Sequence, residues 1–469
     1  MRDIIIHLKP FTFISILSCN LVKKLNKHSR LLFEGRISPQ QEELIMTSSV
    51  KKLPVELEVA DEGKDFTTIF HGIVVNYSIR TVGDSRVLKL ECLSNTYLMD
   101  IDKKIRVFQN KASLYKDVLS YLNTYGNYGF IMTQGVSKNI EKLIVQYNET
   151  DFEFIKRLAS HFNTSISPAH LVSGEKYYFG IPKMVKEVKL EHDYVVKREV
   201  SDDLRKNEKS LPYSIDMGNI TIENESREIY DIGDIAKMGG QEFTVCEIHS
   251  ELIGAELVHK YILKDKLGQY VYKYYNTKII GSSLESSISN VGGSKVKVYI
   301  HEDGIQDSVD WFNYSTVYSS PDGTGWYCMP ENGDSVRLYF PTEKEENGYI
   351  ISAVHVDDEI RNSGQPDIPR SNPDNKSLKS KYGKELLFTP NSIKMTNNHG
   401  MTVLIEDGEG ITISSDKKVT INAEEEINMS SMTKKIDVDG KDSITLTQQG
   451  TTIGLKDIIV LSGNKVNIE

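Results

Sequence analysis

The sequence has few cysteines, and their placement supports neither a disulfide framework nor a metal centre. The four cysteines among 469 residues, Cys19, Cys92, Cys246 and Cys328, lie 73, 154 and 82 residues apart. No CxxC pair occurs, so structural zinc and dithiol redox chemistry are poor explanations for them. We therefore expect four free and buried thiols.

Long apolar runs and an excess of basic charge are also missing. No run reaches the roughly 18 apolar residues that a membrane-spanning helix requires. The 66 acidic residues outnumber the 56 basic ones, and the net charge of -10 argues against nucleic acid as a partner. Asp3, His7, Lys9 and Pro10 break the basic-then-apolar order of a signal peptide, so we interpret Phe11–Cys19 as a first buried strand. Synthesis in the cytoplasm is expected, with no signal peptide and no transmembrane segment.

Motifs that carry catalysis or bind cofactors are missing as well. The chain has no GxSxG, HExxH, Walker loop or Rossmann glycine set. Three stretches hold possible cation ligands: His301, Glu302 and Asp303; His355, Asp357, Asp358 and Glu359; and Asp437, Asp439 and Asp442. Adjacent loop residues rarely point at one centre, so we interpret the first two stretches as solvated turns. The aspartates miss the calcium-loop spacing, and we interpret them as part of a polar outer strand. Paired carboxylates for glycan cleavage stay an open alternative, but no residue favours an enzyme, a cofactor or a metal site.

The first 280 residues show an α+β pattern. Arg86–Cys92 reads as a strand, and Leu114–Gly126 reads as a helix with an apolar stripe and a glycine stop. Thr150 precedes Glu153 by three residues, which predicts a capping box at a helix start. Apolar residues over Ile155–Phe162 then recur at helical spacing.

Two connections and a small barrel are expected next. Residues 281–294 are rich in Ser and Gly and read as a flexible linker. Residues 295–360 contain five short strand patterns, KVKVYI, WFNYSTVY, GWYCM, DSVRLYF and YIISAVHV, which predict a small β-barrel. Residues 361–384 form a second linker, too short for an inserted catalytic domain. We expect the aromatic residues of the barrel segment to fill its core rather than bind a ligand: Trp311, Trp326 and Tyr327.

The last region, residues 385–469, repeats pairs of apolar residues two positions apart. Steps between pairs from Ile411 onward are 8, 8, 9, 8, 9, 6 and 7 residues. Alternation with period two places both members of a pair on one face of a short strand. The pairs are Ile393 with Met395, Val403 with Ile405, Ile411 with Ile413, Val419 with Ile421, Ile427 with Met429, Ile436 with Val438, Ile444 with Leu446, Ile453 with Leu455, Ile459 with Leu461, and Val466 with Ile468.

A lone chain with this pattern buries only about two side chains per repeat, which is a thin core. If three copies wind about one axis, the pairs meet inside and the strand edges pair with other chains. We therefore predict a homotrimer whose core consists of these pairs; a plain antiparallel meander and a single-chain solenoid are the alternatives. Lys417, Lys418, Lys434 and Lys435 are interpreted as solvated corners.

Several segments, in order, resemble those of the trimeric spikes of contractile injection machines. IVQYNETDFEFIKRLASHF (144–162) is similar to the VQYxE[ST]DxxFxxRL segment of the hub. LECLSNTYLMDIDKKIRVFQNKASLYKDVL (90–119) and IYDIGDIAKMGGQEFTVCEIHSEL (229–252) resemble flanking hub segments. KVKVYI, GTGWYCMPENGDSVRLYF and NGYIISAVH resemble the oligonucleotide/oligosaccharide-binding (OB) barrel. The family includes VgrG of type VI secretion and the hub-and-spike proteins of contractile phage tails and tailocins.

The resemblance implies an α+β and all-β multidomain protein: a tube-capping hub with small β-barrels (1–280), an OB-fold barrel (295–360) and a C-terminal triple-stranded β-helix (385–469) in a homotrimer. It implies a structural role, piercing the target envelope on sheath contraction, with the inner tube protein, other baseplate proteins, a separate PAAR-type tip protein and transiently the envelope as partners. The repeats of residues 385–469 contain few of the family's valine-glycine pairs. The segment GNKVNIE does not provide the histidine-rich apex that some relatives have. A trimeric tail-associated peptidoglycan hydrolase or a glycan-binding adhesin is the alternative.

Overall fold

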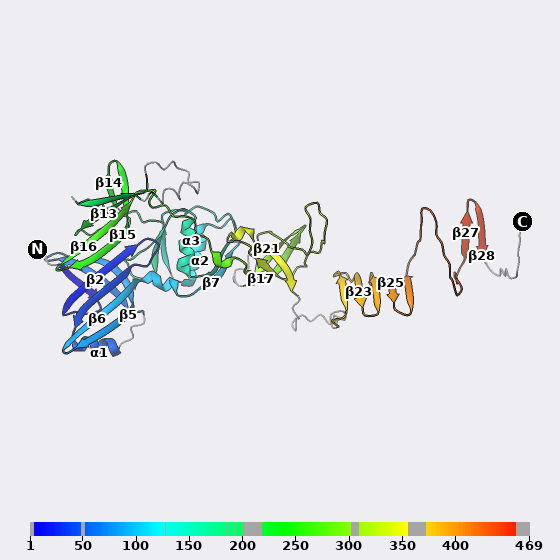
Figure 1. Ribbon diagram of the computed structural model, residues 1–469, viewed down its shortest axis with the longest axis horizontal. Helices are drawn as coiled ribbons and strands as arrows, with labels where there is room; N and C mark the ends of the chain where they lie inside the picture. The colour runs from blue at the N-terminus through cyan, green and yellow to red at the C-terminus, as the bar shows by residue number, and fades with distance from the viewer. Residues whose placement is uncertain are drawn as a thin grey trace. The chain divides into compact units, whose positions relative to one another are not determined.

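The computed structural model of the chain describes residues 4–47, 52–126, 128–184, 186–191, 193–198, 200, 218–301, 309–354 and 372–455. It separates into two compact units, residues 1–357 and 358–469. Strands are the commonest regular secondary structure in both units, and Figure 1 colours them along the chain.

The first unit is built on one 11-stranded sheet in which every pairing is antiparallel. Helix α1 (Pro39–Thr47) follows the third strand in the chain. In spatial order the strands are β1 (Ile4–Lys9), β4 (Pro54–Asp61), β5 (Thr67–Val82), β6 (Ser85–Ser94), β3 (Arg30–Ile37), β2 (Ser15–Lys24), β15 (Gln241–Ile253), β16 (Glu256–Lys264), β13 (Ile220–Ser226) and β12 (Tyr194–Arg198), with β14 (Ile235–Met238) beside β15.

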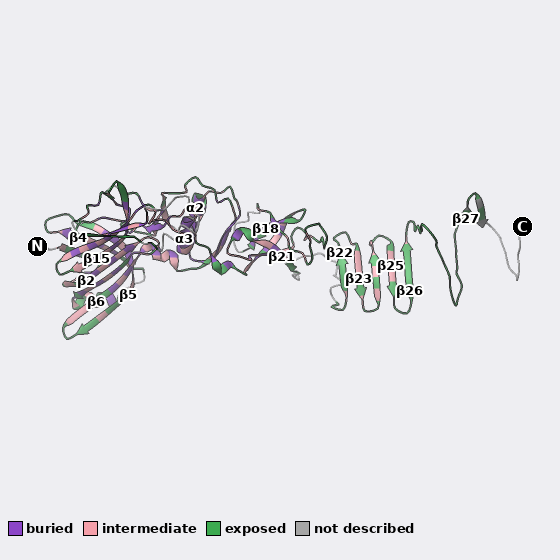
Figure 2. Ribbon diagram, turned by 45° about the horizontal axis from the view of Figure 1, so that its top comes forward, coloured by how far each residue is buried: buried purple, intermediate pink, exposed green. Residues whose placement is uncertain are grey.

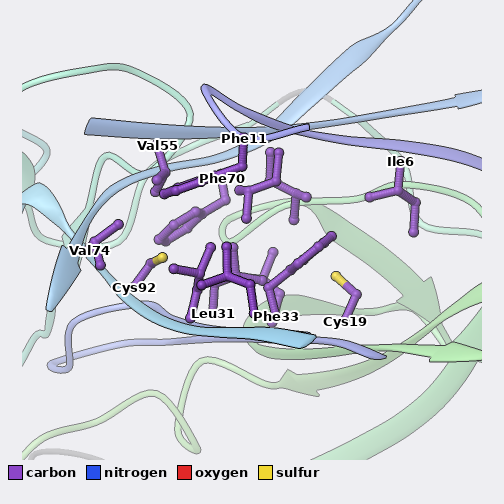
Figure 3. Packing of buried hydrophobic residues seen from close by; sticks show 14 of the residues in the cluster. Ile6, Phe11, Cys19, Leu31, Phe33, Val55, Phe70, Val74 and Cys92 are labelled. Carbon is purple, nitrogen blue, oxygen red and sulfur yellow. The ribbon is translucent and has the colours of Figure 1, made fainter. Parts of the chain in front are cut away.

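Alternation along these strands produces the largest core. In β3 the buried positions are every second residue, and Leu31 and Phe33 are 0% and 1% exposed. Figure 3 shows these two side chains in one cluster with Phe70 of β5 and Cys92 of β6. The predicted strand at 86–92 is confirmed as part of β6.

The N-terminal prediction was misplaced by a few residues. The first strand is β1, and Phe11–Cys19 instead spans a connection and the start of β2 at Ser15. Phe11 and Cys19 are buried, but Ile14 is 71% exposed and Leu17 is 45% exposed, so the segment is only partly buried and the strand boundary was wrong.

Two helices and five short strands form the middle of the first unit. They are α2 (Tyr115–Gly126), α3 (Asp151–Ser160), the antiparallel pair β7 (Lys104–Phe108) and β9 (Ile144–Glu149), and the sheet of β10 (Ile166–Pro168), β11 (Lys176–Phe179) and β8 (Gly129–Met132), with a 3-10 turn η1 (Asn95–Asp100) before them. Both predicted helices are confirmed. The Thr150 Oγ1 accepts from the Glu153 N–H and the Glu153 carboxylate accepts from the Thr150 N–H, both at 3.1 Å.

A small five-stranded sheet follows, in the order β19 (Phe312–Asn313), β18 (Lys295–Ile300), β17 (Ser283–Gly292), β20 (Ser335–Tyr339), β21 (Tyr349–Val354). The 3-10 turn η2 (Thr277–Ile279) precedes the sheet in the chain, and η4 (Glu345–Asn347) lies between β20 and β21. A parallel bridge between Tyr314 and Ile350 brings its two edges together.

The predicted linker at 281–294 is wrong, because these residues form β17, the central strand of the small sheet. Leu284 and Ile288 of this strand are 1% and 2% exposed. The serine and glycine content led to the wrong prediction of a linker. Ser283, Ser287 and Gly292 instead occupy less buried positions of β17. Of the segments expected as strands, WFNYSTVY contributes only β19, and GWYCM contains none.

The second unit begins with five strands in a single antiparallel meander: β22 (Lys376–Lys379), β23 (Glu385–Thr389), β24 (Ser392–Thr396), β25 (Met401–Glu406) and β26 (Gly410–Ser415). A separate hairpin of β27 (Ile444–Gln448) and β28 (Thr451–Leu455) lies further along the chain. The predicted linker 361–384 therefore overlaps β22; its residues 361–371 lie outside the described residues. Figure 2 shows no buried colour on β22–β26.

Within the parts of the chain that the structure describes, no helix has both the length and the apolar character needed to cross a membrane.

Replacing Thr150 by alanine should destabilise α3. The substitution removes the acceptor for the Glu153 N–H and the hydroxyl that donates to Asp100, and a lost N-cap costs about 1 to 2 kcal/mol. Urea unfolding and hydrogen exchange at the α3 amides would measure this loss. Thr150→Ser keeps the oxygen and should stay within a few tenths of a kcal/mol of the natural chain; equal effects of the two substitutions would contradict the capping role.

Candidate functional site

The connection between α3 and the small sheet is a buried cluster centred on Arg157. Its guanidinium donates to the Glu149 carboxylate through Nε (2.9 Å) and Nη2 (2.7 Å), and to the Glu345 Oε1 through Nη1 (2.7 Å). Nη2 also donates to the carbonyl of Val145 (2.7 Å). The side chains of Arg157, Glu149 and Glu345 are 4%, 7% and 8% exposed. Burial opposes the charge of Arg157, but the two carboxylates outweigh it and raise its pKa.

A second cluster lies beside the first and is centred on Asp151, the first residue of α3. Its carboxylate accepts from Arg106 (2.6 Å), Lys104 (2.6 Å), Gln146 (3.0 Å) and the Tyr128 hydroxyl (2.8 Å). Burial disfavours the charged form, yet these donors outweigh burial and lower the pKa of Asp151. The position also places a negative charge at the positive end of the helix dipole.

These clusters give a physical reason for the main polar positions in the segment IVQYNETDFEFIKRL. Gln146 bridges Arg106 and Asp151, and Glu149 holds Arg157. Thr150 caps the helix. Phe154 and Leu158, at 0% exposure, pack in the core on the buried side of α3. The segment is therefore a structural element of the junction.

Apolar packing also crosses this junction. Val107 of β7, Val145 of β9 and Ile279 of η2 belong to the same core cluster as Val298 and Leu338 of the small sheet. The Gln109 side chain donates to the carbonyl of Val298 at 3.4 Å. The small sheet is thus fixed to the preceding region by a shared core and by Arg157 and Glu345, which are 188 residues apart.

The second candidate feature is the face of β22–β26 that carries the apolar pairs, which we name the apolar ladder. Directly paired residues of adjacent strands point to the same face, and the register aligns the pairs in two rows. One row is Leu386, Met395, Val403 and Ile413; the other is Phe388, Ile393, Ile405 and Ile411. The predicted alignment of these pairs on one face agrees with this register.

No described part of the single chain covers the apolar ladder. Ile411 is 70% exposed, Ile413 62% and Met395 57%, and no residue of 372–447 with a described environment is buried. The hairpin β27–β28 pairs Ile444 with Leu455 and Leu446 with Ile453 in the same manner, and Leu446 and Ile453 are 59% and 56% exposed.

Three further predicted core pairs lie between β26 and β27, and the single chain leaves them exposed and outside any strand. Of their first members, Val419, Ile427 and Ile436 are each 53% exposed. Of their second members, Ile421 is 68% exposed, Met429 is 73% exposed and Val438 is 65% exposed. One chain therefore does not bury these six residues as a core, because no apolar layer of its described residues faces them. Their burial between three chains stays a prediction.

Ile459, Leu461, Val466 and Ile468 lie outside the described residues, as does the side chain of Leu455.

The other candidate residues do not form a site in the described structure. His301 bonds weakly to Ser287 (3.2 Å) at the surface; its neighbours Glu302 and Asp303, and the group His355, Asp357, Asp358 and Glu359, lie outside the described residues. Asp437, Asp439 and Asp442 are exposed, as are Lys417, Lys418, Lys434 and Lys435. Among the residues that are described, no group of three potential metal ligands converges.

The expectation of core aromatics in the small sheet is wrong for three residues. Trp311, Trp326 and Tyr327 are 42%, 57% and 77% exposed. The core is filled instead by Phe312, Phe340 and aliphatic residues. Of the cysteines, Cys19, Cys92 and Cys246 are buried as expected, whereas Cys328 is exposed.

Sequence reasoning missed a buried cluster in the large sheet. Lys23 Nζ and His170 Nε2 lie 3.1 and 2.6 Å from the Asp231 Oδ1, and Ser29 Oγ lies 3.5 Å from His170 Nδ1. Serine, histidine and aspartate in this order suit nucleophilic catalysis. Ser29, however, is 1% exposed, so its hydroxyl has no open path to a substrate. The cluster instead ties β2 to the segment before β14.

Replacing Arg157 by methionine should strongly destabilise the first unit, by about 3 to 5 kcal/mol, because Glu149 and Glu345 would stay buried without their shared cation. Chemical denaturation of the full chain would measure the loss. Lys142→Ala is a matched control, since Lys142 pairs with Glu346 at the partly exposed edge of the same junction (29% and 37%) and should cost no more than about 1 kcal/mol. Similar costs for both variants would contradict the central role of Arg157.

Comparison with known proteins identifies the fold. No protein-family model matches the sequence, and no curated protein matches it. Among solved structures, a chain of the lidded Francisella PdpA–VgrG complex matches with a TM-score of 0.56 and 12% identity over 88% of this chain and 80% of that chain. A chain of the half-lidded complex matches with a TM-score of 0.55 and 10% identity over 88% of each chain.

A third structure links the fold to secretion and to phage tails. The E. coli c3393 protein, a component of the type VI secretion system that is structurally similar to the T4 bacteriophage tail proteins gp27 and gp5, matches with a TM-score of 0.51 and 11% identity over 75% of this chain and 100% of that chain. Identities this low establish the fold alone. The resemblance found in the sequence is confirmed at that level: this chain has the fold of VgrG-like tail hub and spike proteins.

Proposed function

We propose that this protein is a structural, homotrimeric hub and spike of a contractile injection machine. Its hub caps the inner tube, and its spike pierces the target envelope when the sheath contracts. The observation that carries the proposal is the uncovered apolar ladder: two aligned rows of apolar side chains on a sheet that no second layer of described residues covers.

Three copies would supply the missing layer. Full burial of an aliphatic side chain contributes about 1.5 to 3 kcal/mol of stabilisation. Covering the apolar ladder of each copy would therefore stabilise the assembly far more than an uncovered sheet can be stabilised by itself. A three-fold arrangement closes on itself and leaves no ladder face open to further copies. The polar residues of the opposite face, such as Lys394 and Thr412, then point outward.

The segment between β26 and β27 supports the same arrangement. The chain forms no strand over 416–443, although the apolar pairs continue through it at steps of 8 and 9 residues. Backbone N–H and C=O groups next to a buried apolar core need partners. In the proposed trimer, strands of the other copies supply them, as in a triple-stranded β-helix.

We assign the small sheet to an OB-fold barrel that forms a neck between hub and spike. The sheet order β19-β18-β17-β20-β21 and the parallel bridge Tyr314↔Ile350 between its edges support this assignment, because a five-stranded barrel requires its edge strands to meet. The junction at Arg157 supports a mechanical role for this neck. Because the proposed hub and barrel share a core and a buried ion cluster, thrust on the hub would reach the barrel through packed side chains.

The proposed partners follow from the proposed machine. They are the inner tube protein at the hub, other baseplate proteins, a separate PAAR-type protein at the spike end and, briefly, the target envelope. The protein would be made in the cytoplasm and incorporated into a phage tail-like or secretion particle. We propose no cofactor and no enzymatic role. Exposed Trp326 and Tyr327 are the observation that favours the alternative, a glycan-binding adhesin or a tail-associated hydrolase.

A charge placed on the apolar ladder should prevent trimer formation. Ile411 is 70% exposed in the single chain, so Ile411→Asp should leave the chain folded while placing three carboxylates near the proposed axis. Mass photometry at micromolar concentration should then show a monomer in place of a trimer. Thr412→Asp is the matched control, because the adjacent side chain lies on the opposite face; it should remain trimeric. A monomeric natural chain, or loss of the trimer in both variants, would contradict the model of assembly.

The purified trimer should be inert toward peptidoglycan. Incubation with intact sacculi, followed by chromatography of the supernatant, should release no soluble fragments and deplete no protein from solution. Soluble fragments would support the hydrolase alternative, and depletion without fragments would support the adhesin.

A further inference from the structure

An aromatic hairpin projects from the small sheet, and no part of the described chain covers it. The aromatic hairpin comprises residues 314–329, between β19 and β20; in Figure 1 it belongs to the yellow-green loop beside β17 and β21. Its ends are anchored, since Tyr314 and Met329 pack against the core of the sheet and the Ser315 N–H donates to the carbonyl of Ile350 (2.8 Å).

Beyond these anchors the hairpin has a defined backbone. The Trp326 N–H donates to the Tyr318 carbonyl (2.9 Å), and the Ser320 N–H donates to the Thr324 carbonyl (2.8 Å). At the tip, the Asp322 carboxylate accepts from the Thr324 N–H (2.9 Å). Gly325 has φ +139°, and a Cβ there would lie 2.4 Å from the Tyr318 carbonyl oxygen, so the close approach of the two arms requires glycine.

This backbone displays large apolar side chains to solvent. Val317 is 93% exposed, Tyr327 77%, Trp326 57% and Tyr318 50%. The Tyr327 hydroxyl donates to the carbonyl of Gly293 (3.0 Å), which fixes the exposed ring against the sheet. A monomeric soluble protein seldom gathers such residues on one exposed hairpin, and a group of this kind marks an interaction surface.

The charge content of the hairpin indicates what kind of partner it meets. In residues 311–330 the only charged residue is Asp322, although charged residues make up 26% of the chain, and the Asp322 carboxylate is engaged within the turn. Tryptophan and tyrosine with few charges are the composition of a buried interface core. The polar side chains of the hairpin are serines, threonines and Asp322. Thr316 and Asp322 are already engaged within the hairpin, and residues 314–329 contain no carboxamide and no second carboxylate to fix the hydroxyl groups of a sugar beside the rings.

We propose that the aromatic hairpin docks on the small sheet of a second copy of this chain, so that the necks of the three copies interlock; this rests on the proposed trimer. Chain length favours this partner over any other. Residues 355–375 join β21 to β22, and a connection of about 21 residues spans at most about 70 Å. Once three apolar ladders assemble, the tethered sheets are held near one another at about millimolar effective concentration.

Cys328 provides a natural reporter for this contact. It lies in the hairpin and is the exposed member of the four cysteines. Burial raises the pKa of Cys19, Cys92 and Cys246 to about 12, so these thiols should react slowly with Ellman's reagent in the folded protein.

The experiment compares thiol reaction rates in the full chain, with the mass of each sample measured by mass photometry. In the trimer, Cys328 should react about 10-fold or more slowly than in the monomeric Ile411→Asp variant, because docking excludes the reagent. The control is Glu62→Cys in a Cys328→Ser background, which places a thiol on an exposed turn after β4. This thiol should react equally fast in the trimer and in the monomeric Ile411→Asp form. The double substitution Val317→Ser, Trp326→Ser should restore fast reaction of Cys328 while the trimer persists through the ladder.

Three results would overturn the proposal, and they can be told apart. A trimer with fast-reacting Cys328 would refute the docked hairpin and leave the proposed spike intact. A monomeric natural chain would refute both. Protection that appears only after soluble peptidoglycan fragments are added would assign the hairpin to a glycan.

Discussion

A single layer of strands cannot bury an apolar face by itself, and this constraint governs the C-terminal unit. The same period-two alternation gives opposite results in the two units. In β3 it buries Leu31 and Phe33 almost completely, because neighbouring strands bring further apolar side chains over them (Figure 3). In β26 it leaves Ile411 and Ile413 more than half exposed, because no described residue lies opposite. The proposed trimer, its stiffness and its symmetry all follow from the need to cover this face.

The junction at Arg157 solves a different problem, the orientation of one folded region on another. A buried ion pair is weak evidence for stability, since well-packed apolar residues often do as well. Its value here is directional. The planar guanidinium donates to Glu149 and to Glu345, and its rigid fork of donors restricts the direction from which Glu345 can approach α3. Apolar packing, such as that of the core cluster that contains Val107 and Val298, is non-directional and fixes the orientation less strictly.

Local patterns carried most of what could be predicted from the sequence. The capping box at Thr150, the strand at 86–92 and the alignment of the ladder pairs depend on residues close in the chain, and each appears in the structure. Glu345 could not be predicted as the partner of Arg157, because no local signal connects residues 188 positions apart. The error at 281–294 came from composition. A serine-rich segment is a flexible linker only if none of its residues packs in a core, and here Leu284 and Ile288 belong to a core cluster. The assignment of Trp326 and Tyr327 to a core was also based on composition. Aromatic content does not show whether a side chain points to the core or to solvent, and both of these side chains are exposed.

The division into two units also suggests an order of assembly. The first unit has complete cores of its own within one chain, so it can fold before any partner is present. The second unit gains little until its ladder meets other ladders, and free strands with exposed isoleucine invite uncontrolled pairing. Lysines beside the apolar pairs, such as Lys417 and Lys418, disfavour edge-to-edge pairing with other chains because their charges would have to be brought together. In the proposed trimer, the first contacts between ladders hold the remaining strands of the three copies at high effective concentration. The meander can then form from pairings between neighbouring strands, which are local in sequence and fast to close.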